Sequence, residues 1–191
     1  MRYLISLLLI VLLTTTFTFA KTNDDPINHR NLQVSEKLID AFYSFHKATL
    51  EAALLTAQSS IPSVVFYQGW AEGGHYKIIK RLPCVAKKLN VVSCSITVQD
   101  DLMLALGIDF NVTDTFEISF SEAKIVLVKT SSNDLDVFWT AREWVNKNHA
   151  ELIDKPCQGI WNGGPTPGDC VRAMVAGYAL FAASDDFQNS K

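Results

Sequence analysis

Two cysteines, Cys157 and Cys170, enclose the segment CQGIWNGGPTPGDC, which holds four glycines, two prolines and one large aromatic residue, Trp161. A disulfide between them would close a loop for which chain entropy gives a stabilisation of about 3 kcal/mol. Tryptophan is over-represented among the residues that dominate binding energy at protein interfaces. We therefore predict a disulfide-closed recognition loop, joined by Glu72 of the segment AEGG. Its predicted binding residues are Trp161, Asn162, Gly163 and Gly164. The alternative is that Trp161 folds back over the core.

The remaining cysteines, Cys84 and Cys94, bring the total to four. An even number of cysteines in an exported chain favours disulfides, and four cysteines permit three pairings. Each pair of neighbours flanks a turn-rich stretch, so the sequence favours Cys84 with Cys94 and Cys157 with Cys170. A structural zinc site made by all four is the rival, although these separations are wider than the knuckles of zinc fingers.

Catalysis is the alternative use of Cys84. The segment before it is basic and contains His75. Positive neighbours lower the pKa of a thiol, and histidine can serve as a general base. Cys84 as nucleophile and His75 as base would make the protein an exported hydrolase. No GxSxG or SxxK motif marks a serine nucleophile. Acid and base catalysis by carboxylates distant in sequence stays open, because such residues can meet in the fold.

The histidines offer little as metal ligands. The chain has four of them, at positions 29, 46, 75 and 149, and none belongs to an HxH or HExxH motif. Glu72 and His75 have ExxH spacing, but they fall in a predicted turn, where that spacing does not fix ligand geometry. We expect neither a metal site nor a cofactor.

The N-terminus has the features of a signal peptide: a short basic start, an apolar run and small residues before Lys21. The apolar run is shorter than the roughly 20 residues of a membrane span, so we expect no stable membrane insertion after cleavage. The net charge of −3 and the lack of a long basic cluster argue against a nucleic-acid partner. We predict a signal peptide over 1–20, a flexible leader over 21–31, one domain over 32–184 and a loose tail over 185–191.

Hydrophobic periodicity predicts the elements that hold these residues. Apolar residues at helical spacing predict one amphipathic helix over 32–57. Runs of β-branched and aromatic residues predict a hairpin of strands 63–70 and 75–82 around AEGG, with further strands over 93–98, 116–120 and 124–129. Alternation in two of these strands predicts inward faces, and the strand over 124–129 is more continuously apolar; the residues expected inward are Cys94, Ile96, Val98, Phe116, Ile118 and Phe120. Helices are predicted over 99–107, 133–153 and 168–184, the first started by Asp100 and Asp101 and the last capped by Asp169. The expected fold is α+β, with an N-terminal amphipathic helix, an antiparallel sheet of about four to five strands and two C-terminal helices, closed by disulfides.

Aromatic residues gather in two stretches of the chain. The first stretch contains Phe66, Tyr67, Trp70 and Tyr76, and the second contains Phe138, Trp139 and Trp144. Most of them are expected in the core, because alternate strand residues face inward and the helix needs an apolar stripe.

These observations favour a binding role over catalysis. We predict a secreted or periplasmic interaction protein, such as an inhibitor, an immunity protein or a secreted effector, whose partner is another protein. The exported hydrolase based on Cys84 and His75 is the competing interpretation.

Overall fold

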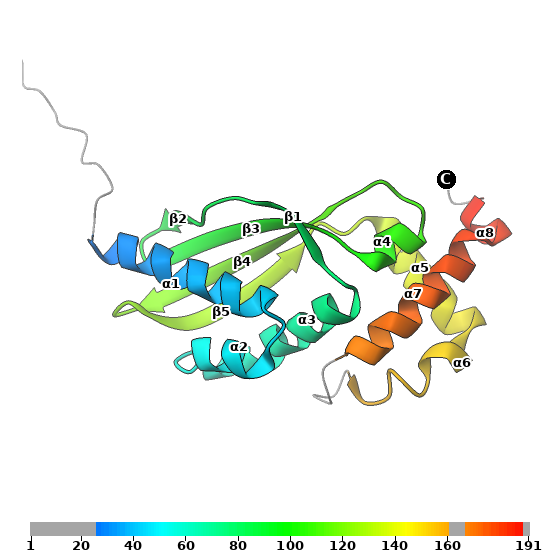
Figure 1. Ribbon diagram of the computed structural model, residues 1–191, viewed down its shortest axis with the longest axis horizontal. Coiled ribbons are helices and arrows are strands. Elements are labelled where there is room, and N and C mark those ends of the chain that lie inside the picture. Colours follow the sequence, from blue (N-terminus) through cyan, green and yellow to red (C-terminus); the bar gives the residue numbers. More distant parts are fainter. Residues whose placement is uncertain (1–25, 161–166, 189–191) are drawn as a thin grey trace, which may run out of the picture.

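The computed structural model describes residues 26–160 and 167–188. The predicted signal peptide and most of the predicted binding loop, including Trp161, lie outside this part of the chain. The described chain has an α+β fold in which one antiparallel sheet of five strands packs against helices (Figure 1). The strands run in the order β1-β3-β4-β5, and β2 also pairs with β3. The predicted fold class is confirmed.

The N-terminal helix is displaced from its predicted bounds. α1 spans Pro26–Tyr43, and a separate short helix, α2, spans Lys47–Ala53. Proline suits the first turn of a helix because its missing N–H has no partner there. The break follows Tyr43, because Phe45 adopts a left-handed backbone with φ of 55°. The prediction of one helix over 32–57 is therefore wrong at its start and in its middle, and the leader is helical from Pro26.

The predicted first strand is a helix. α3 spans Ile61–Gly73, after a 3-10 turn at Gln58–Ser60, and AEGG forms its C-terminal end instead of a hairpin turn. The β-branched and aromatic residues of this segment favour a strand when they are considered locally. In the fold, Val64, Val65 and Ala71 are buried together with Trp70. Burial on a wide helical face overrides the local strand preference.

The strands follow the expected alternation where one face of the sheet is covered. They span Lys77–Arg81 (β1), Val85–Lys88 (β2), Val91–Gln99 (β3), Val112–Ser121 (β4) and Lys124–Ser132 (β5). The inward residues predicted on β3 and β4 are all buried, namely Cys94, Ile96, Val98, Phe116, Ile118 and Phe120. Strand β2 was not predicted. On β5 only Ile125 and Val128 are buried, so the apolar run of this strand is not covered on both faces of the sheet.

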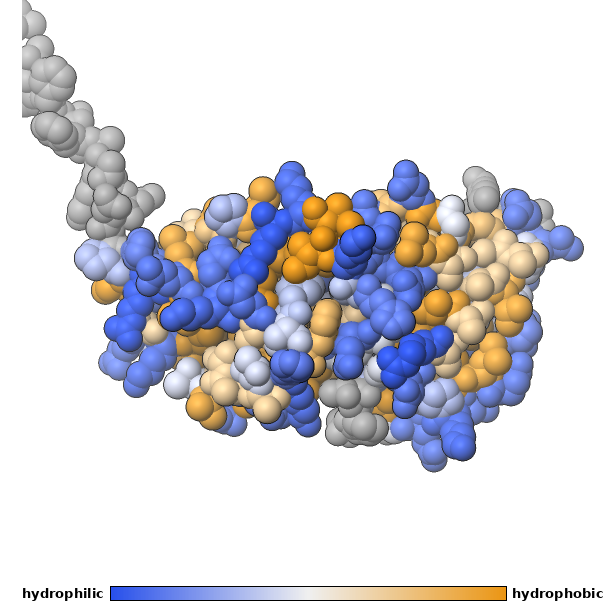
Figure 2. Space-filling model, viewed as in Figure 1, coloured by the Kyte–Doolittle hydropathy of each residue, from blue (hydrophilic) through white to orange (hydrophobic). Residues whose placement is uncertain are grey.

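The two edges of the sheet are protected differently. At β5, the Thr56 hydroxyl donates to the carbonyl of Ile125 at 2.7 Å, and the Val128 N–H donates to the Ser60 hydroxyl at 2.9 Å. The opposite edge, β1 and β2, carries lysines among exposed apolar residues such as Ile79. Figure 2 shows hydrophobic and hydrophilic residues interspersed on the face of the molecule that it draws. Charged side chains on an edge strand oppose pairing with another sheet.

The C-terminal helices pack beside the sheet around α7. They span Asp136–Asn148 (α5), Ala150–Ile153 (α6), Gly168–Ala182 (α7) and Asp185–Gln188 (α8), and a short α4 spans Asp101–Ala105. α7 contacts α3, α4, α5 and α6. In the part of the chain described, no helix is long and apolar enough to cross a membrane.

Two of the predicted helix details can be checked directly. Asp100 caps α4 by accepting a hydrogen bond from the Met103 N–H, as predicted. Asp169 does not cap α7, because the helix begins one residue earlier, at Gly168. Asp169 instead lies in the first turn, where its carboxylate accepts a hydrogen bond from Arg172 at 2.7 Å.

The predicted loose tail is ordered over α8. Phe187 is buried there and packs edge-on against Phe181, with ring centroids 5.3 Å apart. The Trp144 Nε1 donates to the carboxylate of Asp186 at 2.7 Å. The polar segment at α8 therefore packs against α7 through one buried residue, Phe187.

Candidate functional site: an aromatic pocket beside buried carboxylates

Both predicted disulfide pairings are present. Cys84 is bonded to Cys94, and Cys157 is bonded to Cys170. No cysteine of the described chain is free. Cys84 therefore has no thiol to ionise, which removes the nucleophile of the predicted hydrolase. The predicted base, His75, has its Nδ1 2.5 Å from the Asp101 carboxylate at an exposed position.

The predicted binding residues fall mostly outside the described chain. This holds for Trp161, Asn162, Gly163 and Gly164, whereas Glu72 is an exposed residue near the end of α3. The end of the loop at Gly168 meets α3 closely. A Cβ added at Gly73 would lie 2.6 Å from the Gly168 carbonyl oxygen and 2.9 Å from Val171 Cβ. The C-terminal base of the loop and the AEGG segment are thus neighbours in the fold.

The two aromatic stretches noted in the sequence meet at a pocket of about 200 Å³. The pocket lies between α3, α5 and the segment that follows β5. Its lining consists of Phe66, Tyr67, Trp70, Tyr76, Ser132, Asp134, Phe138, Trp139 and Arg142. Most of the aromatic residues of the two stretches lie in the core or pack against it, as expected, whereas Trp139 remains 47% exposed.

The rings of the pocket are held against one another. Phe66 and Trp70 are stacked, with ring centroids 6.4 Å apart, and Phe138 meets Trp139 edge-on at 5.1 Å. The Arg142 guanidinium lies 5.8 Å from the centre of the Trp139 ring. Such contacts between neighbouring rings, and between a ring and a guanidinium, fix the orientation of the rings that line the pocket.

A buried carboxylate lies behind the pocket wall. Asp114 of β4 is fully buried and accepts hydrogen bonds from the hydroxyls of Tyr43, at 2.7 Å, and Tyr67. Burial raises the pKa of Asp114 to about 6, although the two hydroxyls act in the opposite direction. Burial and the nearby Asp114 charge raise the pKa values of both tyrosines, so both phenols stay protonated and able to donate. Tyr67 links this network to the pocket, because it belongs to the lining.

Two further carboxylates surround the same region. Burial raises the pKa of Asp100 to about 6, and it also raises that of Asp134, whose carboxylate accepts a hydrogen bond from Ser132 at 2.5 Å. The pKa of Tyr76 lies well above its ordinary value because of burial and the charges of Asp114, Asp100 and Asp134. The carboxylates that the sequence left scattered are therefore close enough to influence one phenol.

Sequence reasoning found the aromatic residues of this site but not the site. The clustering of Phe66, Tyr67 and Trp70 could have indicated the site, but the segment was predicted to be a strand and it is a helix. On a helix, residues 66 and 70 share a face, and this spacing puts their rings side by side. No sequence pattern marked Asp114 or Asp134 as neighbours of those rings.

The lining of the pocket combines aromatic rings and hydroxyl groups with one charge of each sign, from Asp134 and Arg142. Within residues 26–160 and 167–188, no three or more metal-ligating side chains come together in a group that could hold a metal ion. No protein-family model, curated protein or solved structure matches this chain.

Proposed function

We propose that this chain is an exported binding protein and that the aromatic pocket is its ligand site. The observation that carries the proposal is the composition of the pocket: aromatic walls from α3 and α5 converge with a few polar groups around one concavity. Small-molecule sites typically have this mixture of apolar lining and a few placed polar groups. A volume of about 200 Å³ favours a ligand smaller than a drug-sized molecule.

Export is supported by two independent features. The first twenty residues have the pattern of a signal peptide, and both disulfides belong to a chemistry that persists in oxidising compartments. The intact mass of the protein recovered outside the cytoplasm tests this part of the proposal. The expected mass is that of a chain beginning at Lys21 with no thiol available for alkylation, and a mass that retains residues 1–20 would contradict it.

The pocket is tested with Trp139→Ala, because Trp139 lines it and is too exposed to be essential for folding. Ligand-observed NMR with a mixture of single-ring amines, alcohols and acids should detect binding to the wild type. The variant should weaken that binding at least about tenfold, since it removes one aromatic wall. Leu180→Ala is the matched control, because Leu180 is 44% exposed and is not part of the lining. Equal binding by wild type and Trp139→Ala would reject the pocket.

A protein partner is the second candidate, favoured by the close packing of Gly73 against Gly168. This contact places Glu72 beside one end of the disulfide-closed segment, so the two regions can form one surface for an inhibitor, immunity or effector role. Trp161→Ala should then weaken binding to a partner purified from the same compartment by at least about 2 kcal/mol. Unchanged affinity with unchanged folding would exclude Trp161 from the interface.

A further inference from the structure

One polar atom of a residue that lines the pocket forms no hydrogen bond within residues 26–160 and 167–188. Tyr76 is 8% exposed, and its hydroxyl forms no hydrogen bond within the described residues. In the same part of the chain, the buried side-chain atoms that lack a partner are Nδ2 and Oδ1 of Asn31. The Tyr76 oxygen therefore keeps contact with open space, and the pocket is the open space that Tyr76 lines. A ligand that bonds to this hydroxyl would satisfy it.

The charge around that hydroxyl is negative. Asp100, Asp114 and Asp134 all act on the Tyr76 phenol, and Asp134 also lines the pocket. Ser132 donates one hydrogen bond to Asp134, which leaves other lone pairs of that carboxylate for a ligand donor. A hydroxyl oxygen and a carboxylate that line the same pocket favour a ligand that carries N–H donors and a positive charge.

The aromatic walls favour the same kind of ligand. The face of a tryptophan, tyrosine or phenylalanine ring attracts a cation that lies within about 6 Å of its centre. The protein already shows such a contact in this pocket, where Arg142 lies over Trp139. Arg142 adds a positive charge at the Trp139 side, so a ligand cation is expected at the side of Asp134 and Tyr76.

We propose that the pocket binds a small organic ammonium compound, whose N–H groups donate to the Tyr76 hydroxyl oxygen and the Asp134 carboxylate while its apolar part packs against the aromatic walls. This inference rests on the proposed function of the pocket and adds the chemical class of its ligand. The volume of about 200 Å³ matches one ring with a short amine-bearing chain.

Three probes of one size and different charge test the ligand class. They are 2-phenylethylamine, which is a cation at pH 7, the neutral 2-phenylethanol and the anion 3-phenylpropanoate. Titration calorimetry or NMR with the full mature chain should show the amine binding about tenfold more tightly than the alcohol and more tightly still than the acid. Asp134→Asn should reduce the amine's advantage over the alcohol to about twofold or less, because the amide keeps an acceptor but loses the charge.

Two further variants guard against a purely structural effect. Tyr76→Phe removes a hydroxyl that forms no hydrogen bond with a described residue, so it should change the unfolding midpoint little and weaken amine binding about tenfold. Asp136→Asn removes an exposed charge two residues from Asp134, and it should change amine affinity less than about twofold because solvent screens it. Arg142→Gln should leave amine binding unchanged or tighter.

The outcomes separate this inference from the proposed function. If the amine and the alcohol bind equally and both lose affinity in Trp139→Ala, the pocket is a ligand site but the ammonium class is wrong. If the wild type binds the acid most tightly and Arg142→Gln weakens that binding, the inference is overturned, because the pocket then selects an anion. If no probe binds the wild type, both the ligand class and the pocket are rejected.

Discussion

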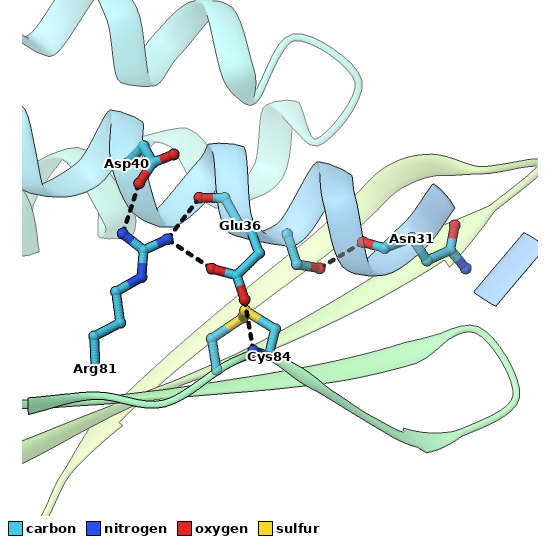
Figure 3. The surroundings of a disulfide bond; sticks show 7 residues. Asn31, Glu36, Asp40, Arg81 and Cys84 are labelled. Carbon is cyan, nitrogen blue, oxygen red and sulfur yellow. Dashed lines mark hydrogen bonds and ion pairs between the residues drawn. A yellow bond between two sulfur atoms is a disulfide. The ribbon is translucent and has the colours of Figure 1, made fainter. Parts of the chain in front are cut away.

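Two polar networks tie α1 to the rest of the fold, and they differ chiefly in burial. Near the C-terminal end of the helix, Tyr43 donates to Asp114 of β4, which also accepts from Tyr67 of α3. In the middle of the helix, Glu36 and Asp40 accept hydrogen bonds from Arg81 at the end of β1 (Figure 3). The carboxylate at the centre of the first, the closed network, is fully buried, whereas the Asp40 side chain of the second, the open network, is 65% exposed. We therefore expect the two networks to contribute unequally to the stability of the fold.

The open network is dense but screened. Arg81 donates Nη1 to Asp40 and Nη2 to Glu36, each at 2.6 Å. The other carboxylate oxygen of Glu36 accepts the Cys84 N–H at 2.6 Å, so the network also meets the Cys84–Cys94 disulfide. The Asp40 side chain is 65% exposed. Solvent-exposed ion pairs typically contribute about 0 to 1 kcal/mol, so this network orients the edge strand more than it stabilises the fold.

The closed network is small but consequential. Asp114 has no exposed surface, and the tyrosines supply the two hydrogen bonds that satisfy it. Burial makes the ionised carboxylate unfavourable, which is why its pKa is raised to about 6. Removing either side leaves polar groups without partners in a dry environment. We therefore expect the two hydroxyl hydrogen bonds to Asp114 to contribute more to stability than the two ion pairs of Arg81.

The largest expected effect is that of Asp114→Ala. At pH 5 it should lower the free energy of unfolding by about 3 kcal/mol, because it leaves two largely buried phenols without an acceptor and creates a cavity. Asp40→Ala, which removes an exposed partner of Arg81, should lower it by about 0.5 kcal/mol. Urea unfolding followed by circular dichroism measures both. Equal losses of unfolding free energy in the two variants would show that the two networks stabilise the fold to the same extent.

The second effect concerns pH and follows from the sign of the Asp114 pKa change. A carboxyl whose pKa is higher in the folded state than its model value of 3.8 binds its proton preferentially when folded. Its contribution to stability is thus fully present below pH 3.8 and is lost as the pH rises through about 6. Ionisation of Asp114 should therefore remove roughly 2 to 3 kcal/mol between pH 4 and pH 7.

Asp114→Asn isolates this contribution, because the side chain cannot ionise and its amide oxygen still accepts a hydrogen bond from one of the two tyrosines. The stability lost in the variant, relative to wild type, should be larger at pH 4 than at pH 7 by that amount. Asp100 has a raised pKa of the same direction and titrates in both proteins, so it cancels in the difference. A difference independent of pH would show that Asp114 ionises in the fold as freely as in the unfolded chain.

Local patterns predicted much of this fold. The alternation of Cys94, Ile96 and Val98 identified β3, and Asp100 identified the start of α4. The disulfide pairings were also predictable, since each joins cysteines of one short segment. In each case the residues that fix the structure lie within a few positions of one another.

The candidate site was not predictable in the same way. Tyr43 and Asp114 are 71 residues apart, and their contact depends on how α1 crosses the sheet. The wall of the pocket at Phe66 and Trp70 depends on α3 being a helix, which its β-branched residues argue against locally. The Tyr43–Asp114 contact and the helical state of α3 both depend on packing between elements that are distant in the sequence. The periodicity of a single segment does not predict such packing.

The smallest expected effect concerns the open network. A double-mutant cycle of Arg81→Met and Asp40→Ala should give a coupling energy of about 0.5 kcal/mol, obtained from urea unfolding of the four proteins. The coupling should decrease when the ionic strength rises from roughly 0.05 M to 1 M, because salt screens exposed charges over this range. Tyr43→Phe is the matched control on the same helix. It should destabilise by about 1 kcal/mol, since it removes one hydrogen bond to Asp114, and this loss should not depend on salt.

A coupling energy near 3 kcal/mol that does not change with ionic strength would contradict this prediction. It would show that the Arg81–Asp40 pair behaves energetically like a buried pair. In that case the contact of Glu36 with the Cys84 N–H would have to lower the mobility of the whole edge, so that Arg81 and Asp40 lose little side-chain entropy on pairing. Glu36→Gln distinguishes the two explanations. It keeps an acceptor for that N–H while removing the charge, so it should leave a strong coupling intact if edge rigidity is the cause and weaken it if the cause is charge.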